Sequence, residues 1–210
     1  MPADPSPAVV AIVDDDASLR EGLDLLLGTR GYAVETFASA EEFLARPGGA
    51  DPACLVADVR LGPGMDGVAL VAALRARGGR LPVIMLTGHA DVDLAVRAMR
   101  AGAFDFLEKP FETERLLAAV AEGIAQAPAA ARPDAAEAAR ARVAALTPRE
   151  QQVLASLVGG NANKNVAHAL GISMRTVAAH RAAVMEKLGV RSFAQAVRLA
   201  VSAGLVAEEP

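Results

Sequence analysis

The sequence predicts an α/β domain with a doubly wound parallel sheet over residues 1–126, followed by an all-α domain over residues 145–210. Three observations lead to this prediction. The first 125 residues alternate short β-rich runs with amphipathic helical patterns, as in a parallel sheet covered by helices on both faces. Beyond residue 145 no strand pattern occurs. Residues 125–145 hold 12 alanines and two prolines, which predicts a partly helical linker over residues 127–144.

Five β-rich runs define the strands of the predicted sheet, and each is followed by a helical pattern. The strands are expected at residues 9–13, 33–37, 54–57, 83–86 and 104–107. Leu19, Leu23 and Leu27 fall on one face of the first helix, and Ser39 with Glu42 predicts a capping box at the second. Because ligands bind such sheets at the carboxyl ends of the strands, that edge is the expected place of a site.

Four helices are predicted in the C-terminal part. Thr147 and Glu150 mark the start of the first, and Ser173 caps the third, which Gly189 ends. Between the second and third helices a three-residue turn contains Gly171. The four expected helices cover residues 147–158, 163–170, 174–188 and 192–203. This arrangement describes a helix-turn-helix unit.

Charge and composition exclude several classes of protein. The chain has 210 residues and a net charge of −4, but residues 1–139 carry −9 and residues 140–210 carry +5. The basic end makes nucleic acid a candidate partner. Apolar runs are too short to cross a bilayer, the start MPADPSP lacks the features of a secretory signal, and Cys54 has no partner for an internal disulfide. We therefore expect a cytoplasmic protein that does not bind membranes.

Carboxylates follow two of the predicted strands. Asp14, Asp15 and Asp16 end the first strand and Asp58 ends the third. Strand ends at one edge of a parallel sheet converge, so these like charges should crowd together, and a bound Mg²⁺ would relieve their repulsion. Thr87 ends the fourth strand and Lys109 follows the fifth. A hydroxyl and an ammonium at the same edge complete a site able to hold a phosphoryl group.

The motifs IVDDD, LTGHAD and AFDFLEKPF, together with Asp58, resemble the receiver domain of two-component response regulators over residues 8–126. The resemblance implies a (βα)5 sheet of strand order 2-1-3-4-5. It also implies that Asp58 accepts a phosphoryl group from a sensor histidine kinase, so that the chain is a phosphoprotein and not an enzyme beyond Mg²⁺-dependent self-phosphorylation and dephosphorylation. Asp15, Asp58 and the Arg60 carbonyl would bind Mg²⁺ directly, with Asp14 nearby.

The same resemblance implies a switch. Lys109 would pair with a phosphoryl oxygen, and its bond to Pro110 is expected to be cis. Thr87 would swing to hydrogen-bond the phosphoryl group, and Phe106 would turn inward. The face formed by the fourth helix, fifth strand and fifth helix would then pair with a second copy. Without the phosphoryl group, we expect the receiver to mask the C-terminal domain or to keep the chain monomeric.

The loop after Asp58 departs from the receiver pattern. It reads Val-Arg-Leu-Gly-Pro-Gly-Met-Asp-Gly and reaches its proline one residue late, with Gly62 or Gly64 as the expected insertion. A harmless surface turn accounts for it most simply. Altered kinase recognition or an altered lifetime of the phosphoryl group stays open, because the loop borders the site.

The segment from Leu146 to Val190 resembles the LuxR-type DNA-binding domain, over residues 145–207. Together the two resemblances place the chain with the bacterial NarL/FixJ response regulators, and the EKPF and TGH segments lean toward FixJ. They imply a transcription regulator that binds promoter DNA as a homodimer and contacts RNA polymerase.

The predicted helix over residues 174–188 carries the expected reading face. Val177, Val184 and Leu188 form its buried stripe. The opposite face enters the major groove in such units, and here it is composed of Arg175, Ala178, Ala179, Ala182 and Glu186. Alanines contact thymine methyl groups but cannot read guanine or cytosine by hydrogen bonds. Phosphate contacts are expected from Lys164, Thr176, Lys187 and Arg191.

The three histidines are not expected to bind a metal, and two alternative functions stay open. His180 either fills a helix interface or faces DNA, whereas His168 and His89 are expected to have no role. A receiver that signals by protein contact, with weak or degenerate DNA binding, stays an alternative because of the alanine-rich face. A Mg²⁺-dependent phosphatase with an aspartyl-phosphate intermediate is a remote one: Asp14 and Asp16 have the required spacing, but no second aspartate cluster follows the fourth strand.

Overall fold

The computed structural model describes residues 7–47, 51–88, 92–126 and 135–205. Contacts between residues divide the chain into two compact units. The first contains residues 1–88 and 107–127, and the second contains residues 89–106 and 128–210.

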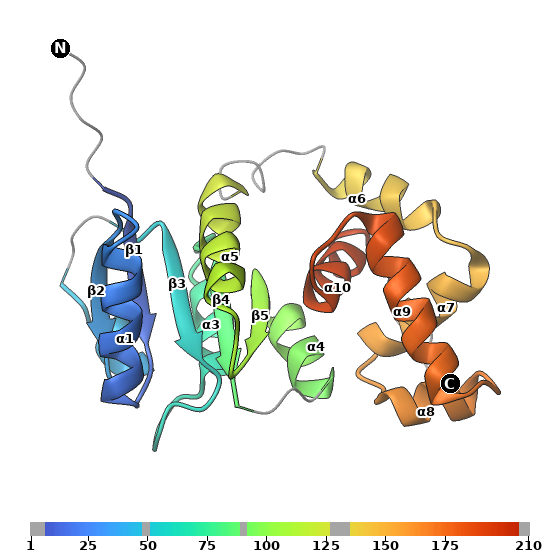
Figure 1. The fold of residues 1–210 in the computed structure, drawn as a ribbon, viewed down its shortest axis with the longest axis horizontal. Coiled ribbons are helices and arrows are strands. Elements are labelled where there is room, and N and C mark those ends of the chain that lie inside the picture. The colour runs from blue at the N-terminus through green and yellow to red at the C-terminus, as the bar shows by residue number, and fades with distance from the viewer. Residues whose placement is uncertain (1–6, 48–50, 89–91, 127–134, 206–210) are drawn as a thin grey trace, which may run out of the picture. The chain divides into compact units, whose positions relative to one another are not determined.

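A five-stranded sheet of order β2-β1-β3-β4-β5 organises the N-terminal part of the chain (Figure 1). The strand order confirms the sequence prediction, and the bounds agree to within one residue. The strands are β1 (Val9–Val13), β2 (Ala33–Phe37), β3 (Cys54–Asp58), β4 (Val83–Thr87) and β5 (Asp105–Glu108). β4 is buried throughout and β1 and β3 nearly so, as expected for central strands, whereas β2 is half-exposed at the edge.

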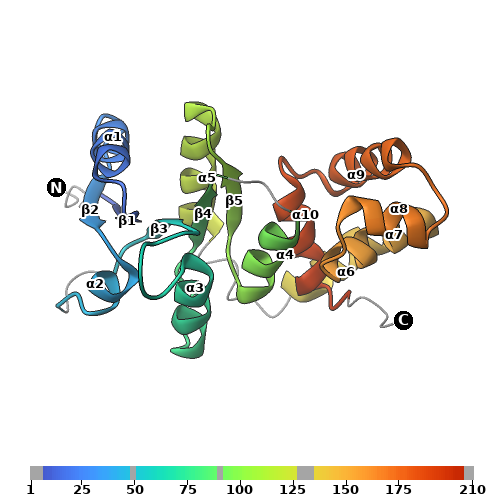
Figure 2. The same cartoon turned by 90° about the horizontal axis from the view of Figure 1, so that it is seen from below.

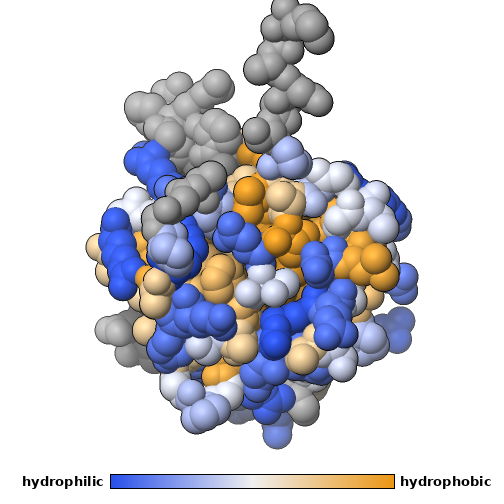
Figure 3. Space-filling model, turned by 90° about the vertical axis from the view of Figure 1, so that its left-hand side faces the viewer, coloured by the Kyte–Doolittle hydropathy of each residue, from blue (hydrophilic) through white to orange (hydrophobic). Residues whose placement is uncertain are grey.

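Helices cover both faces of the sheet in the first unit. Figure 2 shows α1 and α5 on one face and α2 and α3 on the other. The bounds are α1 (Ala17–Gly28), α2 (Ala40–Leu44), α3 (Gly67–Ala76) and α5 (Thr113–Gln126). α1 buries Leu23 and Leu27 and leaves Leu25 71% exposed. The side of the molecule toward α1 and β2 is mixed in hydropathy, with apolar patches among polar side chains (Figure 3).

Among its described residues, the second unit contains helices and the start of β5. Its helices are α4 (Val92–Ala101), α6 (Ala135–Ala144), α7 (Pro148–Val158), α8 (Asn163–Ala169), α9 (Met174–Leu188) and α10 (Phe193–Ser202). Thr147 and Glu150 form the predicted capping box of α7, and Gly189 takes the left-handed conformation that ends α9. In the interior of this unit, Val153 and Leu157 of α7 pack with Val166 of α8 and Val177 of α9.

Two of the predictions fall partly or wholly outside the described residues. The helical part of the linker is α6, while residues 127–134 lie outside the described residues, as does His89. At α2 the capping box is only partly as predicted: Ser39 accepts from the Glu42 N–H, but the Glu42 carboxylate accepts from the Ala38 N–H. Among the helices that the structure describes, none is long and apolar enough to span a membrane.

Candidate functional site

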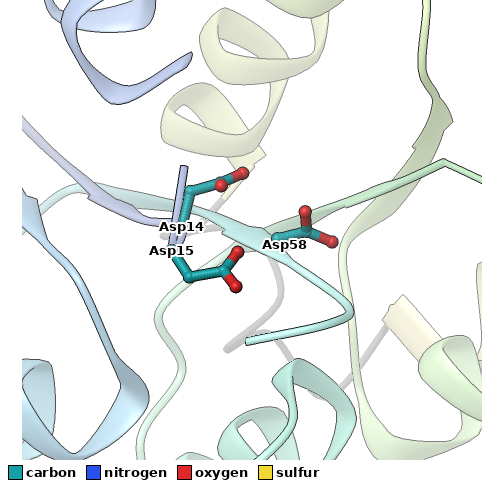
Figure 4. Close-up of side chains that lie close together, drawn as sticks. All are labelled: Asp14, Asp15 and Asp58. Carbon is teal, nitrogen blue, oxygen red and sulfur yellow. The ribbon is translucent and has the colours of Figure 1, made fainter. Parts of the chain in front are cut away.

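The strand register brings carboxylates from two strands together in the first unit. Val13 lies opposite Ala57, so the next residues, Asp14 and Asp58, leave adjacent strands side by side. The side chains of Asp14, Asp15 and Asp58 lie close together (Figure 4). One oxygen from each lies within 4.8 Å of the others. We call these three residues the aspartate cluster.

The ammonium group of Lys109 links two members of the aspartate cluster, Asp14 and Asp58. The Lys109 ammonium donates to Asp14 Oδ2 at 2.9 Å and to Asp58 Oδ2 at 2.5 Å. Burial alone would lower the pKa of Lys109, but its bonds to Asp58 and Asp14 outweigh that effect and the pKa is raised. Lys109 is therefore a fixed positive charge beside Asp58. Its peptide bond to Pro110 is cis, as expected from the resemblance.

Asp14 is the buried member of the aspartate cluster, with a relative exposure of 1%. Burial raises its pKa, although hydrogen bonds from Lys109 and the Asp16 N–H work in the opposite direction. The Arg20 guanidinium donates to the Asp14 carbonyl oxygen at 2.6 Å and fixes the backbone there. Sequence reasoning missed this contact, because Arg20 reads as an exposed residue of α1.

The oxygen atoms of the aspartate cluster suit a divalent cation. Three carboxylates at such short range repel one another, and hard cations such as Mg²⁺ favour this donor set. Arg60, whose carbonyl is the fourth predicted ligand, is the second residue of the loop after β3, and its N–H donates to Asp58 Oδ1 at 2.9 Å. That bond orients the Asp58 carboxylate, while the other oxygen of Asp58 faces Lys109.

The predicted switch residues occupy the ends of neighbouring strands. Thr87 is buried at the end of β4, next to Leu86, which pairs with Asp58. The Thr87 carbonyl oxygen accepts a hydrogen bond of 2.6 Å from the backbone N–H of Lys109. Phe106 lies in β5 and is largely buried.

Gly67 is required at the start of α3. A Cβ atom there would lie 2.1 Å from the Asp58 carbonyl oxygen, so any larger residue would push α3 away from the aspartate cluster. The Gly67 N–H also donates to the Val59 carbonyl oxygen at 2.9 Å, and Asp66 caps α3 by accepting from the Ala69 N–H. The resemblance had drawn attention to the length of this loop and not to the close approach at its end.

The second unit presents the predicted reading face on α9. Val177, Val184 and Leu188 are buried. The residues expected on the other face, namely Arg175, Ala178, Ala179, Ala182 and Glu186, are all exposed. Met174, at the start of the helix, is 58% exposed and adds an apolar side chain that the sequence analysis did not include. Among the residues named, this face therefore offers one guanidinium, from Arg175, and one carboxylate, from Glu186, among small and apolar groups.

The four residues predicted to contact phosphates differ in their surroundings. Lys164 and Arg191 are exposed. The Lys187 ammonium instead lies on the Glu150 carboxylate, at 2.8 and 2.9 Å from its oxygens. Thr176 is half-buried, and its hydroxyl shares a hydrogen bond of 2.8 Å with Ser173 at the start of α9. These two contacts stabilise the helix-turn-helix fold itself.

Two histidines and two arginine–phenylalanine pairs complete the description of the second unit. His180 is half-buried on α9, and His168 is exposed. The Arg181 guanidinium stacks on the Phe193 ring, with Cζ 4.3 Å from the ring centroid. A second pair of this kind is formed by Arg198 of α10 and Phe104, at 3.9 Å.

Comparison with known families covers both parts of the chain. Residues 10–121 match the response regulator receiver domain, and residues 144–200 match the luxR family of bacterial regulatory proteins. The boundaries of the receiver match include α4, which the contacts group with the C-terminal helices.

Similar proteins match the chain over nearly its full length. The chain is 44% identical over 198 residues to the transcriptional regulatory protein FixJ of Bradyrhizobium diazoefficiens, covering 94% of this chain and 96% of FixJ. It is 46% identical to the C4-dicarboxylate transport transcriptional regulatory protein DctR of Rhodobacter capsulatus, covering 90% and 98%.

Two solved structures are similar to the chain over nearly its full length. Full-length FixJ from B. japonicum has a TM-score of 0.56 and 45% identity, covering 95% of this chain and 98% of that one. The response regulator StyR has a TM-score of 0.55 and 41% identity, covering 93% and 98%. With an aspartate cluster at one sheet edge and an exposed helix in a luxR-type domain, this chain belongs to the FixJ-like two-component response regulators, which join a receiver to a LuxR-type DNA-binding domain and regulate transcription.

Proposed function

We propose that Asp58 accepts a phosphoryl group from a sensor histidine kinase and that the modified chain dimerises and binds promoter DNA in the cytoplasm, where it acts on RNA polymerase. The observation that carries this proposal is the bond from Lys109 to Asp58 at the edge of the aspartate cluster. A partly buried ammonium beside an oriented carboxylate is the arrangement that phosphoryl transfer to that carboxylate needs.

The chemistry follows from the residues around Asp58. The Arg60 N–H holds one carboxylate oxygen, and the other is free to attack phosphorus once Lys109 moves to a phosphoryl oxygen. The new P–O bond forms as the bond to the phosphoryl donor breaks. Thr87, at the next strand end, is the hydroxyl that would bond a second phosphoryl oxygen. Mg²⁺ bound by Asp14, Asp15, Asp58 and the Arg60 carbonyl would offset the charge on the transferring group.

The second unit supports a way of restraining the unmodified chain. Within that unit α10 packs against α4, and Asp105 at the start of β5 is fully buried. The Asp105 carboxylate accepts from the Ser192 hydroxyl at 2.9 Å and from the Gln195 amide at 3.1 Å. Since α4 and β5 belong to the face expected to pair with a second copy, α10 occupies part of that face. Dimerisation would require these bonds to break.

A second function, signalling by protein contact, is favoured by one observation. The exposed face of α9 has Arg175 as its only guanidinium among the residues predicted to read bases, and alanines supply most of the rest. Such a face distinguishes A·T from G·C poorly through hydrogen bonds. We nevertheless place DNA binding first, because the face is exposed and belongs to a luxR-type domain.

The test is phosphorylation in solution. Full-length protein is incubated with Mg²⁺ and acetyl phosphate, and its mass and oligomeric state are followed together, beside the Asp58→Asn variant. We expect one phosphoryl adduct and a dimer for the wild type only. An equal adduct on Asp58→Asn would contradict the assignment of Asp58. An adduct without dimer or DNA binding would favour signalling by protein contact.

A further inference from the structure

The loop that joins β3 to α3, residues 59–66, is expected from the receiver pattern to carry one extra residue, and it lies beside the aspartate cluster. We call it the acceptor loop. Hydrogen bonds hold both ends of the loop. At its start the Arg60 N–H donates to the Asp58 carboxylate, and at its end the Gly67 N–H donates to the Val59 carbonyl oxygen. In the acceptor loop Val59 and Leu61 are both buried at 3% exposure, so two side chains anchor its first half.

A glutamate outside the acceptor loop holds its second half. Glu41, in the first turn of α2, accepts the Met65 N–H on Oε1 at 2.8 Å. This bond is the largest of the causes that lower the pKa of Glu41, so the side chain is a carboxylate at neutral pH. The residues are 24 positions apart in the chain, and the contact therefore ties α2 to the loop beside Asp58.

Two glycines of the acceptor loop lie close to carboxylates on either side of it. Gly64 has a φ of 131°, and a Cβ atom on it would lie 2.7 Å from the Glu41 carboxylate. Only glycine allows the carboxylate to come so close. A Cβ atom on Gly62 would lie 3.6 Å from Asp15 Oδ2. The loop thus contacts Glu41 on one side and approaches the aspartate cluster on the other.

From this geometry we infer that Glu41 is a positioning residue that holds the acceptor loop over Asp58 and lengthens the life of its phosphoryl group. The inference rests on the proposed function. Hydrolysis of an aspartyl phosphate needs a water molecule to reach phosphorus: its oxygen forms the new P–O bond, the bond to the Asp58 carboxylate breaks, inorganic phosphate leaves and the proton passes to solvent. A loop held by Glu41 restricts that approach, and a released loop admits water.

Three variants test the role of Glu41. Glu41→Ala removes the acceptor of the Met65 N–H, whereas Glu41→Gln keeps an oxygen there. The matched control is Glu42→Ala, because Glu42 is an exposed glutamate of the same helical turn whose carboxylate binds the Ala38 N–H and not the acceptor loop. Each full-length protein is phosphorylated with acetyl phosphate and Mg²⁺, the donor is removed, and the decay of the adduct is followed by mass. Hydrogen exchange of the Met65 amide is measured in parallel.

We expect the adduct to decay about 2- to 10-fold faster in Glu41→Ala, which is the range for the loss of one hydrogen bond. The Met65 amide should lose protection in that variant, and Glu41→Gln and Glu42→Ala should resemble the wild type. Equal decay in all variants, with an adduct formed, would overturn this inference alone. Equally fast decay in Glu42→Ala would overturn it as well, by assigning the effect to α2. Failure of the wild type to form any adduct would overturn the proposed function, and this inference with it.

Discussion

The aspartate cluster and the exposed face of α9 are built in opposite ways. The cluster combines residues from the ends of two strands, and register, burial and the Lys109 bonds determine its geometry. The face of α9 comes from one continuous helix, and each of its predicted base-reading side chains is exposed. Contacts with neighbouring residues therefore constrain the aspartate cluster, whereas helical periodicity alone arranges the exposed face of α9.

This difference explains where each site tolerates change. A residue of the aspartate cluster cannot be replaced without leaving a buried charge or a missing ligand, because Asp14 and Lys109 depend on each other. Small residues on α9 cost the fold nothing, so their identities reflect only what the helix contacts. Substitutions in the aspartate cluster should therefore change the chemistry of the first unit strongly. Single substitutions on the exposed face of α9 should change the DNA preference of the second unit gradually.

The strongest test of the comparison is Lys109→Ala. It leaves Asp14 buried beside Asp58 with no ammonium to balance them. We expect the rate of phosphorylation by acetyl phosphate to fall about 100-fold, the usual effect of removing one charge-stabilising group. The adduct is measured by mass over time. Arg30→Ala, which removes an exposed ion pair to Glu114 in the same unit, should leave the rate unchanged; a similar fall there would mean that both variants act through stability.

The corresponding test on α9 is Arg175→Ala. If Arg175 supplies the specific hydrogen bonds of the reading face, its loss should weaken binding to the preferred site about 10- to 100-fold. Binding of the phosphorylated protein is measured by fluorescence anisotropy at several salt concentrations. Lys164→Ala is the contrasting variant: as a phosphate contact it should weaken all sequences alike and lower the salt slope by about one. Equal behaviour of the two variants would show that α9 does not read bases.

The pair between Glu150 and Lys187 links stability of the second unit to pH. The Lys187 bond and the Thr147 N–H lower the pKa of Glu150 from its ordinary value of 4.5. Its stabilising effect is therefore complete above pH 4.5 and disappears as the pH falls through the lowered pKa of the folded state. Glu150→Ala, which also removes the bond from the Thr147 N–H to the Glu150 carboxylate, should cost about 1–2 kcal/mol at neutral pH.

Urea unfolding at pH 7 and pH 3 measures this effect. The difference between wild type and Glu150→Ala should shrink at pH 3, and Glu186→Ala, on the exposed face of α9, should change neither value. A difference that is the same at both pH values would contradict the ionic contribution and leave only the packing of the side chain.

The smallest expected effect concerns the restraint of the unmodified chain by α10. Arg198→Ala removes the stacking on Phe104, and about 3- to 10-fold tighter DNA binding without phosphorylation should follow. Arg181→Ala is the matched control, because it removes the same type of stacking, on Phe193, without touching β5 or the residues before it. DNA binding before and after acetyl phosphate treatment is compared. If both variants bind as the wild type does, the α10 contact does not restrain the protein.

Much of the fold could be predicted because its signals are local. Alternation of strands and helices, and capping residues such as Ser173 and Thr147, depend on neighbours within a few positions of the chain. The aspartate cluster was predictable for a different reason: parallel strand ends meet at one edge, so Asp14 and Asp58 had to be close once both strands were assigned. The Lys187 contact was not predictable, since its partner Glu150 lies 37 residues away on another helix.

By itself, the sequence determined the strand order through its resemblance to receivers, the residues of the aspartate cluster and the buried stripe of α9. These features depend on periodicity and on motifs that the chain carries in order. Only the tertiary structure decided that Glu41 binds Met65, that Gly67 packs against the Asp58 backbone, and that Asp105 is buried against Ser192 and Gln195. Each of these contacts joins polar or small groups far apart in the chain, and such groups leave no periodic pattern in the sequence, because their partners are set by packing and not by spacing.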